Sequence, residues 1–72
     1  MRSKASKEAL LRSLQSQSAA FPQVMREIEI AVANEEYRKA FLMIVELKNQ
    51  GLWKPDLEDE RNLEDFWWEY GQ

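Results

Sequence analysis

The sequence contains no cysteine and no histidine. Because it lacks cysteine, it can form neither a disulfide nor a thiolate metal site, and a chain of 72 residues without disulfides is more typical of the cytoplasm than of secretion. The usual ligands of zinc, copper, haem and iron-sulfur clusters are missing, so we expect no metal and no cofactor. The commonest proton shuttle near neutral pH is missing as well.

Glycine and proline are scarce, with two of each, and no apolar run approaches the roughly 18 residues that a membrane-spanning helix needs. We therefore expect no membrane partner. Three Trp, three Phe and two Tyr argue against disorder. Apolar residues recur every three to four positions, which predicts helices. The predicted fold class is all-α, a compact bundle of three to four short helices with a helical hairpin around Asn34.

These helices are expected to form a single domain over residues 1–72. A basic N-terminal helix is predicted at about residues 4–18, central helices at about 22–50, and an acidic and aromatic C-terminal helix at about 56–70. A single core of this size supplies roughly 3 to 5 kcal/mol, and without disulfides or metals the remaining way to add stability is association. We therefore expect a homodimer.

The expected helix ends follow from residues with known terminal preferences. Ser3 or Ser6 is expected to cap the first helix, since a serine side chain accepts a hydrogen bond from a free N–H group. Pro22 suits the first position of the second helix, where its missing N–H is not needed. Gly51 can adopt the left-handed conformation that closes a helix, and Asp56 is a natural N-cap for the last one.

The central region contains two apolar stripes that do not share one side of a single helix. Ile44 of the second stripe lies 16 residues after Ile28 of the first. A helix turns by about 100° per residue, so 16 residues give about 1600°, and after four full turns the two stripes lie roughly 160° apart around the helix axis. Either one long helix is buried on opposite sides at its two ends, or a turn near Asn34 reorients the second half. The turn is favoured, because Asn34 can cap a new helix with Glu35 and Glu36 in its positive first turn.

Residues 33–40, followed by Ile44 and Leu47, resemble the turn and second helix of a tetratricopeptide repeat. The preceding helix lacks the Trp, Leu and Gly signature of that repeat, and no second copy follows at the repeat length of about 34 residues. The resemblance supports the hairpin around Asn34, and no family is assigned from it.

The charges are distributed unevenly along the chain, although the net charge is only -3. Residues 1–54 carry nine Lys or Arg against six Asp or Glu, whereas residues 55–72 carry one against seven. This pattern predicts that the acidic end either pairs with the N-terminal helix, within or between subunits, or attracts a basic partner. The alternative is that both ends are simply solvated.

The acidic segment also contains four of the eight aromatic residues. Trp and Tyr are enriched at energetic hot spots of protein interfaces, because they bury a large area with few rotatable bonds. The candidate residues for binding a partner or a second subunit are Trp53, Leu63, Glu64, Asp65, Phe66, Trp67, Trp68 and Tyr70. The competing interpretation, in which the rings close the domain's own core, is favoured for Trp53 and Trp67. Binding is favoured for Trp68 and Tyr70.

Catalysis is poorly supported, and we expect neither catalytic residues nor an enzyme. The two Ser-Lys pairs near the N-terminus are adjacent residues, so their side chains diverge. Asp56, Glu58 and Glu60 alternate like the first ligands of a calcium loop, but Arg61 stands where the turn glycine would be. Acids at a helix N-terminus explain that spacing better.

The sequence therefore predicts a small non-enzymatic interaction module, an adaptor or regulator, that binds a protein partner or a second subunit through the acidic and aromatic C-terminal helix. Two alternatives remain. The first is a dimeric nucleic-acid-binding protein that uses the basic first helix, with Arg2, Lys4, Lys7 and Arg12 as candidate contacts. The sequence pI of about 4.9 argues against a dedicated nucleic-acid binder. The second alternative is an acidic inhibitor or antitoxin that occupies a basic groove.

Overall fold

The computed structural model describes the backbone of residues 2–71 and the side chains of residues 5–71. Within this part of the chain every regular element is helical, which confirms the all-α prediction. The elements in order are α1 (Arg2–Ser16), the short 3-10 helix η1 (Ser18–Ala20), α2 (Pro22–Ala33), α3 (Tyr37–Asn49), α4 (Leu57–Phe66) and the π-helical turn η2 (Trp67–Gly71).

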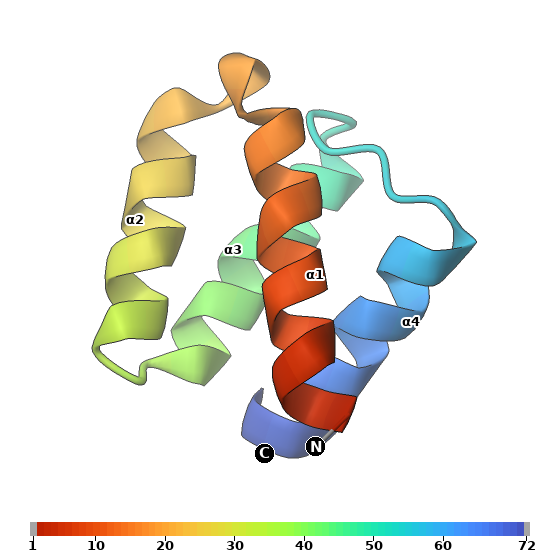
Figure 1. The fold of residues 1–72 in the computed structure, drawn as a ribbon. Coiled ribbons are helices and arrows are strands. Elements are labelled where there is room, and N and C mark those ends of the chain that lie inside the picture. The colour runs from red at the N-terminus through yellow and green to blue at the C-terminus, as the bar shows by residue number, and fades with distance from the viewer. Residues whose placement is uncertain (1, 72) are drawn as a thin grey trace.

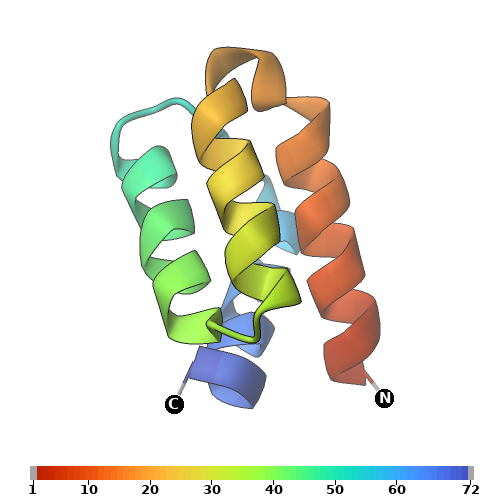
Figure 2. The same ribbon diagram turned by 90° about the vertical axis from the view of Figure 1, so that its left-hand side faces the viewer.

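The four α-helices surround one core, with α1 in front, α3 behind, and α2 and α4 on the two sides (Figure 1). The closest packing is between α1 and α4 and between α2 and α3. Turned by 90°, the bundle shows α2 in front of the core and α4 behind it (Figure 2). In both views the start of α1 and the end of η2 lie at the same end of the bundle.

The core contains residues from every α-helix and from two of the connecting segments. Its buried apolar members are Leu10, Leu14, Phe21, Met25, Ile28, Ala31, Ala40, Ile44, Leu47, Trp53, Leu63 and Phe66. On each helix these residues recur at three- and four-residue spacing, as the sequence pattern predicts. Within the described part of the chain, none of the helices combines the length and the apolar character that crossing a lipid bilayer requires.

The chain does break at the predicted hairpin, but Asn34 has a different role from the one expected. It ends α2 instead of capping α3, so the predicted N-cap is wrong. Glu35 adopts the left-handed conformation with φ of 61°, and its N–H donates to the carbonyl of Val32. Glu36 donates to the carbonyl of Ala31 and precedes α3. This Schellman arrangement satisfies the last carbonyls of α2, which explains why Asn34 belongs to the first helix.

Three other predicted helix ends are confirmed. Pro22 occupies the first turn of α2. Gly51 has a φ of 74° just after α3, and its N–H donates to the carbonyl of Lys48 at 3.0 Å. Asp56 caps α4 by accepting a hydrogen bond from the N–H of Asp59. Each position is one where the backbone needs a conformation or a partner that few residue types provide.

The first helix differs from its prediction at both ends. It begins at Arg2 and ends at Ser16, so it lies two residues earlier than the predicted range of 4–18. Ser6 lies inside the helix and is buried, where its hydroxyl donates to the Asp65 carboxylate at 3.1 Å. Ser6 therefore serves a contact between helices and does not cap α1. The side chain of Ser3, the other predicted cap, lies outside the described residues.

Candidate protein-binding surface

Helix α4 is held at its start by a capping box. The side chain of Asp56 accepts a hydrogen bond from the N–H of Asp59 at 2.8 Å, and the Asp59 carboxylate accepts one from the N–H of Asp56 at 3.2 Å. Glu58 and Glu60 add negative charge to the first turn, where the helix dipole favours it. The N-terminus of the acidic helix is therefore fixed by its own acids.

A hydrogen-bonded chain joins this capping box to α1. The hydroxyl of Ser13 donates to the Asp59 carboxylate at 2.9 Å, and the same hydroxyl accepts the indole N–H of Trp53 at 3.2 Å. Trp53 has no exposed surface at all. Its prediction as a partner-binding residue is not supported, because its ring fills the core and its polar N–H is already satisfied.

Two further candidate residues also face the interior. Leu63 and Phe66 are buried in the core, and the Phe66 ring meets the edge of the Tyr37 ring at a centroid distance of 6.0 Å. These two residues provide the buried side of α4 and hold the helix in place. Phe66 is covered by the core, whereas Leu63 also lines an open groove between α3 and α4. The sequence correctly places them on one helix face, but it does not indicate which way that face points.

The C-terminal turn is fixed by aromatic and polar contacts. The ring centroid of half-buried Tyr70 lies 4.5 Å from the ring centroid of Tyr37, and the ammonium of Lys7 lies 5.1 Å from the Tyr70 centroid. The Arg38 side chain donates to the Gly71 carbonyl at 3.1 Å. Tyr70 therefore belongs mainly to the packing between η2, α1 and α3.

Trp67 forms one wall of an open groove between α3 and α4. Its ring lies over the Phe41 ring at a centroid distance of 4.7 Å, and the two rings are tilted by 36°. The groove has a volume of about 480 Å³. The residues that line it are Phe41, Val45, Lys48, Leu57, Glu60, Arg61, Leu63, Glu64 and Trp67. We call this feature the α3–α4 groove.

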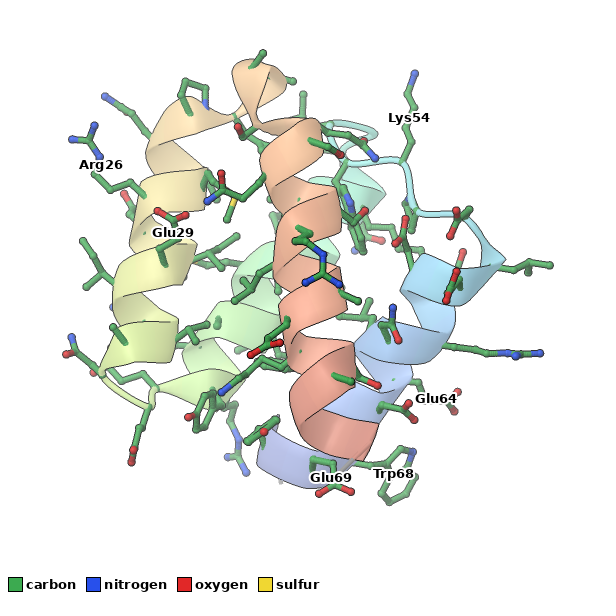
Figure 3. The ribbon with its side chains drawn as sticks, in the orientation of Figure 1. Arg26, Glu29, Lys54, Glu64, Trp68 and Glu69 are labelled. Carbon is green, nitrogen blue, oxygen red and sulfur yellow. The ribbon has the colours of Figure 1, made fainter. Side chains whose placement is uncertain are left out.

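Trp68 is the exposed ring of the segment, with 64% of its surface accessible. Figure 3 shows it pointing away from the bundle just beyond α4, with Glu64 on the turn above it. Leu57, at the start of α4, is 85% exposed. Because Leu57, Arg61, Glu64 and Trp68 are three or four residues apart in sequence, they follow one another along one side of the helix. We call these four residues the α4 stripe.

Sequence reasoning missed Leu57 and the contribution of α3 to this surface. Leu63 lies six residues after Leu57, which is a rotation of about 600° around the helix axis. Leu57 therefore lies roughly 120° away from Leu63 and the buried face. This phase difference was a usable signal that Leu57 is exposed. Phe41 and Val45 of α3 also line the groove, and only the packing of α3 beside α4 shows this.

The acidic tail does pack against the N-terminal helix within one subunit, as one of the predicted arrangements required. The contacts are hydrogen bonds from Ser6 to Asp65 and from Ser13 to Asp59. Among the described side chains, the ion pair of α4 is with α3, between Glu60 and Lys48 at 3.2 Å. Asp65 is therefore engaged with α1, whereas Glu64 stays exposed beside the α3–α4 groove.

The candidate nucleic-acid residues do not form a continuous basic strip within the described side chains. Lys7 lies over the aromatic rings of Tyr37 and Tyr70. Arg12 lines a different groove, of about 710 Å³ between α1 and α2, together with Glu8, Leu11, Gln15, Ser16 and Glu29. The side chains of Arg2 and Lys4 lie outside the described residues. The described basic groups thus point to different sides of α1, and acids accompany Arg12.

No protein-family model matches the chain, and comparisons with curated proteins and with solved structures found no significant match.

Proposed function

We propose that the protein is a small non-enzymatic interaction module, an adaptor or regulator, that binds another protein through the α4 stripe and the α3–α4 groove. The cytoplasmic location predicted from the sequence is part of this proposal. The observation that carries it is the exposure of Trp68, 64% of whose surface is accessible to solvent. When a partner covers an indole in this position, a large apolar area is removed from water, which favours binding.

The surroundings of Trp68 support the same function. Leu57 is exposed at the other end of α4, so two large apolar side chains delimit the α4 stripe. The α3–α4 groove lies beside them and has apolar walls from both helices. Aromatic anchors next to a concave apolar surface with a polar rim are typical of protein interfaces.

The homodimer expected from the size of the chain stays a prediction. A second copy could cover the same stripe, as the sequence-based hypothesis allowed. Sedimentation of the purified protein over a range of concentrations measures this directly, because a dimer through the stripe would be lost in the variant Trp68→Ala and retained in the variant Ile30→Ala.

The proposal is tested by affinity capture from cells that express the chain naturally. Trp68→Ala removes the exposed indole, and the matched control Ile30→Ala removes an exposed apolar side chain from α2, where Ile30 is 54% accessible. Truncating a hot-spot Trp typically costs 2 kcal/mol or more, so capture should fall by about 30-fold or more. The control should retain the partner. Equal capture by the parent and both variants would refute the proposal.

A further inference from the structure

The spacing of the α4 stripe is the same in both directions along the helix. Its residues Leu57, Arg61, Glu64 and Trp68 are separated by four, three and four positions. At about 100° per residue they fall within an arc of about 60° on the outer side of α4. All four are exposed. The stripe therefore has a large apolar side chain at each end, with one cation and one anion placed symmetrically between them.

This order of residues is complementary to itself when a second copy of α4 lies antiparallel against it. We consider a twofold axis that is perpendicular to the helix and level with the midpoint between Arg61 and Glu64. It places Leu57 of each copy beside Trp68 of the other, and Arg61 of each copy beside Glu64 of the other. Every contact is then made twice, as a twofold interface between identical chains requires.

A parallel pairing of the same two stripes does not match. It places Arg61 beside Arg61 and Glu64 beside Glu64, and like charges that face one another across an interface lower its affinity. In the antiparallel arrangement each charge of the stripe faces an opposite charge instead. The two charges therefore select one orientation for a second copy.

The other acids of the segment do not lie between the paired helices. Glu58 and Glu69 each directly follow a residue of the stripe, so they lie about 100° around the axis from it and flank the contact. Both are exposed, and water and salt screen the repulsion between flanking charges. The remaining acids have partners within the fold: Asp56, Asp59, Glu60 and Asp65.

The α3–α4 groove lies on the other side of the stripe from Glu58 and Glu69. Glu60 and Trp67, which line it, lie about 60° and 80° around the axis from Leu57 in the direction opposite to Glu58. The twofold axis lies in the plane of contact, so it brings the two grooves to the same side of the helix pair. Apolar walls of both grooves then adjoin the contact.

On these grounds we infer that the partner that covers the α4 stripe is a second copy of this chain, paired antiparallel through α4 about a twofold axis. The inference rests on the proposed function and adds the identity and the register of the occupant to it. Association of this kind also adds stability to a small domain that has no disulfide.

The first measurement is sedimentation equilibrium of the purified full chain between about 1 μM and about 1 mM, a range that covers weak to moderate association. The parent should pass from monomer to dimer within this range. Trp68→Ala removes two rings from each dimer and should weaken dimerisation by about 30-fold or more. Ile30→Ala, on α2, should leave it unchanged.

Charge reversals test the register. Arg61→Glu and Glu64→Arg each turn both attractive pairs into repulsive ones, so each should weaken dimerisation by about tenfold or more. Glu64→Arg is the sharper variant, because it changes the net charge of the chain from -3 to -1 and would strengthen a dimer that is limited by overall repulsion. The double variant, Arg61→Glu with Glu64→Arg, restores both pairs and should dimerise within about threefold of the parent.

The matched controls are Arg26→Glu and Glu27→Arg on α2. Both residues are exposed, and among the described residues neither takes part in a side-chain hydrogen bond or ion pair. These variants change the net charge of the chain by the same amounts as the reversals on α4. Each should alter the dissociation constant of the dimer by less than about twofold, as distant charges do.

The inference is overturned if the parent stays monomeric over the whole range, if Glu64→Arg dimerises at least as tightly as the parent, or if the double variant stays as weak as the single ones. Its failure is distinguishable from that of the proposed function. If the purified chain is monomeric but Trp68→Ala loses a captured protein of different sequence, the stripe binds protein and the second copy is wrong. If Trp68→Ala captures every protein that the parent captures, the proposed function itself is wrong.

Discussion

The hydroxyl of Ser13 joins three parts of the fold, and removing it should cost a large share of the stability. It accepts the indole N–H of Trp53 at 3.2 Å and donates to the Asp59 carboxylate at 2.9 Å. Asp59 in turn belongs to the capping box that begins α4. The variant Ser13→Ala therefore leaves a fully buried indole N–H without its acceptor and weakens the start of α4.

The magnitude follows from these two bonds. A hydrogen bond to a charged group contributes about 1.5 to 3 kcal/mol, and an unsatisfied buried donor costs about 1 to 3 kcal/mol. Ser13 and Asp59 are only half-buried, so in the variant water hydrogen-bonds to part of what the hydroxyl had bound. We therefore expect Ser13→Ala to lower the free energy of unfolding by about 2 kcal/mol. For a domain of this size that value corresponds to a lowering of Tm by about 8 to 16 °C.

Urea unfolding followed by circular dichroism measures this effect. Ser16→Ala is the matched control, because the Ser16 hydroxyl is exposed and donates only to a carbonyl within α1. The variant Trp53→Phe removes the indole N–H, so the cost of Ser13→Ala should be about 1 kcal/mol smaller in that background. The reasoning is refuted if Ser13→Ala and Ser16→Ala change the free energy of unfolding equally, or if the double mutant shows no coupling.

Three further predictions concern single positions. Gly71→Ala should lower the free energy of unfolding by about 1 to 3 kcal/mol in urea, because the new Cβ would lie 2.2 Å from Cε3 of Trp67; an unchanged midpoint would contradict this close packing. Gly51→Ala should cost about 1 to 2 kcal/mol through its φ of 74° alone, since the space around it is open, and Gly51→Asn should cost measurably less. Trp68→Ala should change the thermal midpoint by no more than a surface substitution does, about 0.5 kcal/mol in stability, and a larger loss would mean that the ring supports the fold.

Much of the fold could be predicted because local rules act strongly at a few residues. Pro22, Gly51 and Asp56 each have a backbone requirement that is visible in the sequence, and the structure places all three as expected. The turn at Asn34 was predicted from the change of phase between two apolar stripes. The role of Asn34 could not be predicted, because Asn suits either end of a helix. The residue that ends α2 by adopting the left-handed conformation is Glu35, and a glutamate in the sequence does not indicate that conformation.

The candidate surface was less predictable, since burial of a ring depends on contacts between distant segments. Trp53 follows α3 in a connecting segment without periodicity, and the hydrogen-bond acceptor of its buried indole N–H is Ser13, forty residues earlier. Within the π-helical turn Trp67 packs on Phe41 of α3, whereas its neighbour Trp68 is exposed. These contacts join α1, α3 and the C-terminal segment, so no short window of sequence contains them.

The most direct test of the central claim is site-specific photocrosslinking of the full chain in its natural cells. The crosslinking residue p-benzoylphenylalanine is placed at position 68 or, as the control, at position 30 on α2. We predict one discrete adduct with a partner protein from position 68 and none with that protein from position 30. Adduct formation that is equal from the two positions, or absent from position 68, would contradict the assignment of the α4 stripe as the binding surface.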